Sequence, residues 1–101
     1  MIRHVVQLTF KPGTSDEAVA RIINSLNSLP PLILEIHAYT LGRDLSLSPG
    51  TVDFAIVADF KSVEDFEVYA NHPTHLQIIN DVIKPHVSSR SALQFKLDEE
   101  T

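Results

Sequence analysis

The sequence predicts an α+β domain in which helices cover one face of an antiparallel β-sheet. Three observations support this class. Four segments resemble strands, two segments open with helix-capping residues, and apolar side chains recur at helical spacing after each cap. The predicted order is strand, helix, strand, strand, helix pair, strand. With 101 residues and 44% hydrophobic content, residues 1–101 are expected to form a single domain around one core.

The first strand is predicted over residues 2–10, where apolar and polar residues alternate. One face of this strand would carry Ile2, His4, Val6, Leu8 and Phe10. His4 is therefore a polar ring on an apolar face. This placement makes His4 a candidate for a functional site.

The first helix is expected to begin at a capping box, with Thr14 as the N-cap and Glu17 three residues later. The apolar residues that follow at helical spacing are Val19, Ile22, Ile23, Leu26 and Leu29. Pro30-Pro31 is expected to end the helix.

Two central strands are predicted next. In residues 32–41, one face would carry Leu34, Ile36 and Ala38, and the other His37, Tyr39 and Leu41. Residues 42–50 contain the turn-forming residues of a loop. The third strand follows at residues 52–60, with apolar residues at every second position.

A proline hinge between two short helices is predicted around Tyr69-Ala70-Asn71-His72-Pro73-Thr74-His75. The first helix begins at the capping sequence Ser62-Val63-Glu64-Asp65. Because Pro73 fits only the first turn of a helix, a second helix should begin there. Tyr69 would lie in the last turn of the first helix, His72 at the N-cap and His75 at the third position of the second. The second helix would face the core with one side, which carries His75, Leu76, Ile79, Val82 and Ile83. This helix would stop before Pro85.

The last strand would turn Ser91, Leu93, Phe95 and Leu97 toward the helices. The acidic cluster Asp98-Glu99-Glu100 that follows would be a solvated tail.

The whole order fits a ferredoxin-like βαββαβ subunit with a four-stranded sheet. Its helix-free face would carry Val5, Tyr39, Leu41, Ala55 and Val57. That set is too apolar for bare water, so a homodimer through the sheet face is expected.

Composition excludes several classes of function. There is no cysteine, which removes disulfide and thiolate chemistry. The net charge of −5 argues against a nucleic-acid partner. No apolar run is long enough to span a membrane or act as a signal peptide, so a cytoplasmic protein without membrane contact is expected.

Several motifs together resemble a known family. They are Ile2-Arg3-His4-Val5-Val6 running to Phe10-Lys11-Pro12-Gly13, then Leu41-Gly42-Arg43-Asp44, then Tyr69-x-x-His72-Pro73-x-His75 with Pro85 after the helix. The chain resembles the stress-responsive A/B-barrel family, also called the dimeric α/β-barrel or Dabb domain, over nearly its whole length. The resemblance implies a ferredoxin-like subunit whose sheet packs against that of a second copy. Some members are linked to stress responses, and a plant polyketide cyclase of this fold performs an aldol-type ring closure without metal.

The resemblance also implies site residues. Tyr69 and His75 match the catalytic pair of that cyclase, and His4 matches its substrate-positioning histidine. An imidazole can act as a base near neutral pH, and a phenol can donate a hydrogen bond to a reacting oxygen. The ligand would lie in a pocket between the sheet and the helices. The residues expected to bind it are His4, His72, Val6, Leu8 and Ile79.

Other interpretations remain open at this point. The histidines of the hinge could satisfy free backbone groups, and His4 could bond a carbonyl at the rim of the core. Three imidazoles could hold zinc, but the break at Pro73 spoils the helical spacing of two of them, so no metal and no cofactor are expected. Asp53 and Asp59 could bind a cation at a dimer interface. Two classes of function are left. The first is a homodimer that binds a small apolar or aromatic molecule, or only a partner, without turnover. The second is a cofactor-free lyase or cyclase with His75 as the base and Tyr69 as the donor.

Overall fold

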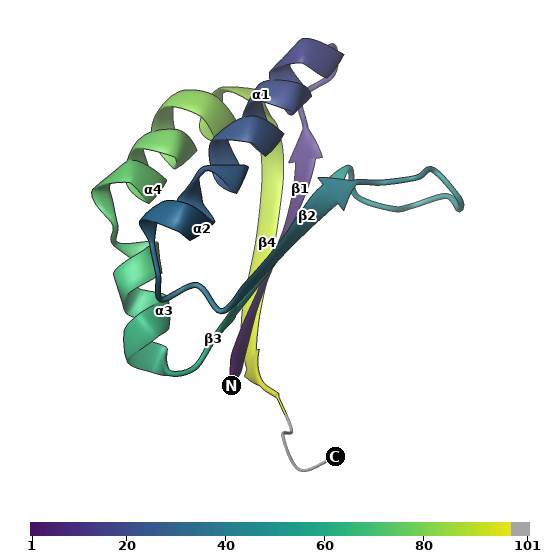
Figure 1. Ribbon diagram of the computed structural model, residues 1–101. Helices are drawn as coiled ribbons and strands as arrows, with labels where there is room; N and C mark the ends of the chain where they lie inside the picture. Colours follow the sequence, from purple (N-terminus) through teal and green to yellow (C-terminus); the bar gives the residue numbers. More distant parts are fainter. Residues whose placement is uncertain (98–101) are drawn as a thin grey trace.

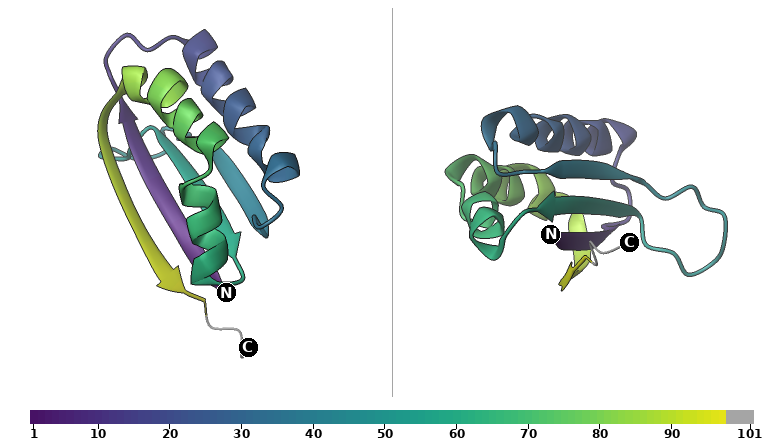
Figure 2. Two further views of the ribbon diagram at one scale, coloured as in Figure 1. Left: turned by 90° about the vertical axis from the view of Figure 1, so that its left-hand side faces the viewer. Right: turned by 60° about the horizontal axis from the view of Figure 1, so that its bottom comes forward.

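The computed structural model describes residues 1–97, and the predicted tail Asp98-Glu99-Glu100 lies outside them. Four antiparallel strands form one sheet in the order β2-β3-β1-β4. They are β1 (Ile2–Phe10), β2 (Ala38–Arg43), β3 (Phe54–Phe60) and β4 (Val87–Lys96). All of the helices pack on one face of this sheet (Figure 1, Figure 2). The predicted ferredoxin-like βαββαβ class is confirmed.

Helix α1 (Asp16–Asn27) begins one residue later than predicted. Ser15 is the N-cap, because its hydroxyl accepts a hydrogen bond from the Ala18 backbone N–H at 3.1 Å. The prediction of Thr14 as the cap was wrong. The Thr14 hydroxyl donates to the Lys11 carbonyl at 2.7 Å and closes the preceding turn. Both residues suit a cap, and the turn at Pro12-Gly13 decides which one stands at the helix start.

The prolines after α1 begin a helical turn and do not end one. Helix α2 (Leu29–Leu32) places Pro30 and Pro31 in its first turn, where a missing backbone N–H costs nothing. Strand β2 therefore starts at Ala38 rather than at residue 32. Tyr39 and Leu41 pair with Ala58 and Ile56 and pack against the core. Their predicted place on the helix-free face was wrong.

The predicted hinge is confirmed by the helices after β3. Helix α3 (Val63–Ala70) is capped by Ser62, and α4 (Pro73–Ile78) has His72 as its N-cap. The chain then widens into the π-helix η1 (Ile79–Ile83) and tightens into the 3₁₀ turn η2 (Lys84–His86). The predicted inner side was wrong at Leu76, which is 42% exposed. In α4 the buried positions are His75 and Ile78, three residues apart, and Leu76 lies outside that pair.

The register of β4 reverses its predicted faces. His4 lies opposite Gln94, Val6 opposite Ala92 and Leu8 opposite Arg90. The even-numbered residues of β4 therefore face the helices. Leu93 and Phe95, which were predicted to face them, are exposed on the other side of the sheet. In a strand, a shift of one residue moves every side chain to the opposite face.

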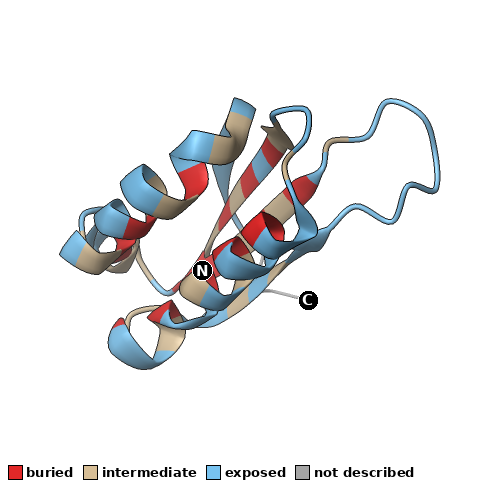
Figure 3. Ribbon diagram, turned by 90° about the horizontal axis from the view of Figure 1, so that it is seen from above, coloured by how far each residue is buried: buried red, intermediate tan, exposed pale blue. Residues whose placement is uncertain are grey.

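The buried residues lie between the sheet and the helices, while the loop that joins β2 to β3 projects away and is largely exposed (Figure 3). The core is built of apolar side chains from every layer, chiefly Val6, Leu8, Val19, Ile22, Leu26, Leu29, Ile33, Phe54, Ile56, Ala58 and Phe60.

The helix-free face of the sheet combines apolar residues with one ion pair. Val5 lies between Val57 on β3 and Leu93 on β4. Beside them the Arg3 guanidinium donates to both carboxylate oxygens of Asp59, each at 2.8 Å. These hydrogen bonds lower the pKa of Asp59 and occupy the carboxylate that was considered for a cation.

Within residues 1–97, no helix combines the length and the apolar composition needed to cross a bilayer. The expected cytoplasmic location stays a prediction.

Candidate functional site

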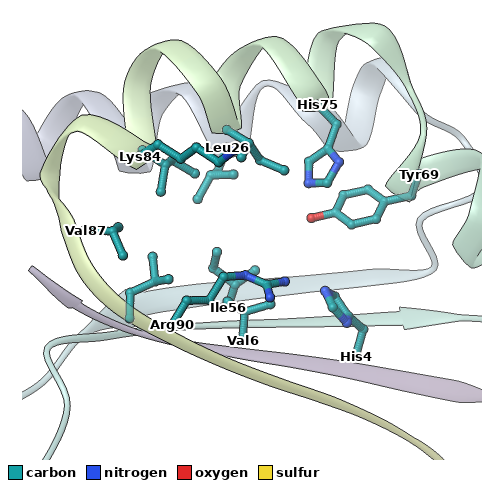
Figure 4. Close-up of a pocket in the computed structure, with 12 residues that line it drawn as sticks. His4, Val6, Leu26, Ile56, Tyr69, His75, Lys84, Val87 and Arg90 are labelled. Atoms are coloured by element: carbon teal, nitrogen blue, oxygen red, sulfur yellow. The ribbon is translucent and has the colours of Figure 1, made fainter.

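A cavity of about 290 Å³ lies between the sheet and the helical layer. Strands β1, β3 and β4 supply its floor, and α1, α4 and the turns after α4 supply its roof (Figure 4). Its apolar lining consists of Val6, Leu8, Leu26, Ile56, Ile79, Ile83 and Val87. Its polar lining consists of His4, Tyr69, His75, Lys84 and Arg90. The sequence-predicted residues Tyr69, His75, His4, Val6, Leu8 and Ile79 are thus brought to one cavity.

His4 lies on the floor of the cavity and is 6% exposed. Its Nδ1 is 2.7 Å from the side-chain amide nitrogen of Gln94, which lies opposite it on β4. An amide nitrogen donates, so Nδ1 accepts and the proton of the neutral ring is on Nε2. The ring packs against Phe66, with 5.0 Å between ring centroids. His4 can therefore offer an N–H donor toward the cavity.

Tyr69 occupies the last turn of α3 and is 2% exposed. Figure 4 shows its ring pointing from α3 into the cavity with the hydroxyl leading. That hydroxyl is 3.0 Å from the hydroxyl of Tyr39 on β2. If Tyr39 donates in this pair, the Tyr69 proton is free to hydrogen-bond a ligand. Sequence reasoning missed Tyr39 because the start of β2 was misplaced.

His75 stands at the third position of α4, and its ring lies against the Tyr69 ring with 4.1 Å between centroids and 32° between planes. Its Nδ1 lies 3.3 Å from the Ala70 carbonyl oxygen. A carbonyl can only accept, so Nδ1 carries the proton and Nε2 of the neutral ring holds the lone pair. The bond to the end of α3 thus fixes the tautomer in which Nε2 can act as a base.

His72 does not line the cavity. Its Nδ1 accepts a hydrogen bond from the Thr74 backbone N–H at 3.1 Å and caps α4. The ring that was expected to bind a ligand therefore has a structural partner. Among residues 1–97, no three His, Asp or Glu side chains converge as a metal site.

Burial sets the protonation states in the cavity. It lowers the pKa of His4 to about 4, with smaller contributions from the nearby Arg90 and, when its ring is protonated, His75. It also lowers the pKa of His75, against the opposing effect of the hydrogen bond to Ala70. It raises the pKa of Tyr69. At neutral pH both imidazoles are therefore uncharged, and the phenol keeps its proton.

Arg90 and Lys84 were not predicted for the site. Arg90 preceded the residues assigned to the last strand, and the reversed faces of β4 concealed its direction. One signal was present: if Leu93 and Phe95 cover a dimer face, then Arg90, Ala92 and Gln94 must face the helices. Lys84 could not be placed from sequence, because the π-helix and the 3₁₀ turn set where it points.

Comparison with known proteins gives the family context. Residues 2–97 match the model of the Stress responsive A/B Barrel Domain. The chain is 26% identical over 85 residues to a stress-response A/B barrel domain-containing protein of Arabidopsis thaliana, a match that covers 84% of this chain. The chain spans about a third of that relative's length, 32%.

Two solved structures have the same fold. One, from Thermobifida fusca, is described as a dimeric ferredoxin-like protein of unknown function. It is 35% identical with a TM-score of 0.88, and the match covers 95% of this chain and 90% of that one. The other is a hydroxynitrile lyase from Passiflora edulis, 22% identical with a TM-score of 0.85, covering 99% and 95% of the two chains. The chain therefore belongs to the stress responsive A/B barrel domain family.

Proposed function

We propose that this protein binds a small, mostly apolar molecule with at least one oxygen substituent in the cavity beneath α4. The supporting observation is the composition of the cavity wall. Apart from two cationic side chains it is apolar, except at one end, where His4, Tyr69 and His75 present polar atoms. Small-molecule sites commonly have this composition. A cavity of ~150 Å³ binds benzene, so about 290 Å³ suits a molecule of bicyclic size.

The test is a titration with 2-acetonaphthone, a neutral bicyclic ketone, followed by calorimetry or ligand-detected NMR. Ile79→Phe places extra bulk in the cavity wall and should weaken binding by about ten-fold or more. Leu76→Phe adds a ring to an exposed position on α4 and serves as the matched control. Absence of binding to the unmodified protein would refute the proposal for neutral carbonyl ligands, and equal affinity in all three proteins would refute binding in the cavity.

A second candidate function is cofactor-free acid–base catalysis in the same cavity. The observation that favours it is the His75 tautomer, which leaves Nε2 as a free base beside the Tyr69 hydroxyl. The fold is also shared with a hydroxynitrile lyase, at an identity too low to transfer its activity. The proposed reaction is an intramolecular aldol closure of a dicarbonyl compound.

In this reaction, His75 Nε2 removes a proton from the carbon next to one carbonyl group, while Tyr69 donates a hydrogen bond to the enolate oxygen. The enolate carbon then forms a bond to the second carbonyl carbon. The oxygen left negative there takes the proton back from the His75 imidazolium. The product is an isomer of the substrate, so no other reactant is needed.

The proton-transfer step can be measured without the natural substrate. We expect the protein to accelerate hydrogen–deuterium exchange next to the carbonyl groups of heptane-2,6-dione, followed by NMR in D₂O. His75→Gln should lose about 10²-fold or more of the acceleration, and Tyr69→Phe a similar factor. His72→Gln, outside the cavity, is the control. Exchange at the rate of buffer, or an unchanged rate in His75→Gln, would leave ligand binding as the only candidate.

We also infer that the protein is a homodimer through the helix-free face of the sheet. Leu93 is 56% and Phe95 43% exposed there, next to Val5 and Val57. Exposed apolar side chains grouped on one face are typical of an interface. The similar protein from Thermobifida fusca is described as dimeric, which supports the same assembly here.

A further inference from the structure

The feature that the proposed function leaves unused is the guanidinium of Arg90. Arg90 lies opposite Leu8 in the β1–β4 register, so its side chain leaves the strand on the face that the helices cover. Figure 4 shows it extending over the cavity floor, on the same wall as His4 and below Tyr69 and His75. Within residues 1–97 it forms no ion pair and no hydrogen bond. Arg90 is exposed, so water can solvate its charge, but its side chain also lines the cavity and is available to a ligand there.

The charge of Arg90 acts on the polar end of the cavity. It contributes to the shifted pKa values of His4, His75 and Tyr69, which shows that all three groups lie within its field. Lys84 also lines the cavity, yet it contributes to none of these three shifts. Figure 4 shows Lys84 on the helical side of the cavity and Arg90 on the sheet side, where His4 also lies.

No negative charge balances these cations inside the cavity. The twelve lining residues contain neither Asp nor Glu. With both histidines uncharged and the tyrosine protonated, the cavity carries the two positive charges of Lys84 and Arg90 at neutral pH. A guanidinium presents parallel N–H donors in a planar fork that matches a carboxylate, and such bidentate pairs are strong and directional.

We propose that the cavity binds a carboxylate-bearing ligand, with the carboxylate held in bidentate fashion by Arg90 and the ring system on the apolar floor. His4 supplies a second donor, because Gln94 occupies its Nδ1 and leaves the Nε2 proton for the ligand. This inference rests on the proposed binding function and specifies the class of ligand: a monocarboxylic acid of about bicyclic size, in place of a neutral carbonyl compound.

The experiment uses a matched pair of probes, 2-naphthoate and 2-naphthamide. The two have nearly the same shape and differ in charge. The protein should bind 2-naphthoate at least ten-fold more tightly than 2-naphthamide at pH 7, a difference of about 1.4 kcal/mol. Calorimetry gives both affinities, and increasing salt should reduce the difference between the affinity for the acid and the affinity for the amide.

Variants identify which positive charge causes the preference for the acid. Arg90→Gln should remove the preference for the acid and leave the binding of the amide unchanged. Arg90→Lys should restore only part of it, because an ammonium keeps the charge but loses the fork. Lys84→Gln removes a charge from the same cavity, and Lys96→Gln removes one from the same face of β4 outside it. Both should keep the preference.

Each outcome decides between the proposals. If the acid and the amide bind equally, or if Arg90→Gln keeps the preference, the carboxylate site is refuted while cavity binding stands. If Lys84→Gln and Arg90→Gln weaken the acid equally, a diffuse positive field replaces the bidentate site. If 2-acetonaphthone and both naphthyl probes fail to bind, cavity binding itself is refuted. Thermal unfolding checks that each variant folds.

Discussion

Acidification from pH 7 to pH 5 should destabilise this protein, and His4 should account for a large part of the loss. The folded environment lowers the pKa of His4 from 6.5 to about 4, mainly through burial. The unfolded chain therefore takes up the proton first as the pH falls. The stability that His4 contributes is fully present above pH 6.5 and is lost between about pH 6.5 and about pH 4.

The size of the effect follows from the two pKa values. A difference of about 2.5 in pKa corresponds to roughly 3 kcal/mol once the loss is complete. At pH 5, about 2 kcal/mol of it has been lost. His75, whose pKa is also lowered by burial, acts in the same direction. Asp59 has a lowered pKa as well, but a carboxylate loses its contribution at lower pH, so the interval from pH 7 to pH 5 isolates the histidines.

The assay is urea unfolding followed by circular dichroism at pH 7, 6 and 5. The protein concentration must be constant, because a dimer makes the midpoint depend on it. In His4→Gln, the free energy of unfolding should fall by about 2 kcal/mol less between pH 7 and pH 5 than in the unmodified protein, whatever the stability of the variant at pH 7. His86→Gln removes an imidazole outside the cavity and serves as the control. An equal loss in the unmodified protein and in His4→Gln would refute the placement of His4 as a buried neutral ring.

Three further predictions test the neighbouring structure. Tyr39→Phe should cost about 1 kcal/mol in urea unfolding, because it removes the hydroxyl pair with the tyrosine of α3; an unchanged midpoint would show that this pair does not stabilise the fold. Ser15→Ala should cost about 1 kcal/mol and Thr14→Ala less, since only Ser15 caps α1; the reverse order in the same assay would restore the capping box predicted from sequence. Leu93→Glu should dissociate the dimer in analytical ultracentrifugation, while Leu34→Glu, at an exposed leucine away from the sheet face, should not. A dimer that survives Leu93→Glu would place the interface elsewhere.

The sequence determined the fold class and most of the cavity. Alternation in β1 placed His4, Val6 and Leu8 on one face, and every segment that packs against that face had to bring its apolar side to it. The Pro73 hinge is equally local, since proline fits only a first turn. This placed Tyr69 at the end of α3 and His75 three residues into α4. Local rules therefore placed each of these three rings on its element, and the family resemblance supplied the expectation that they share one pocket.

What local rules could not decide was register. The start of β2 depends on whether Pro30 and Pro31 end a helix or begin one, and both are permitted at the level of the sequence. The faces of β4 depend on its pairing with β1, because either alternate set of its residues could serve as the inner one. Tyr39 was missed for the first reason and Arg90 for the second.

The sequence by itself thus determined an α+β subunit with an apolar cavity and three titratable rings near a helix hinge. Only the tertiary structure decided which charges share that cavity. Hydrogen bonds across the sheet fix β4 so that Arg90 points inward and Leu93 outward, and the π-helix fixes where Lys84 lies. The physical reason is that periodicity within one segment specifies its two faces, whereas contacts between segments specify which face meets the core.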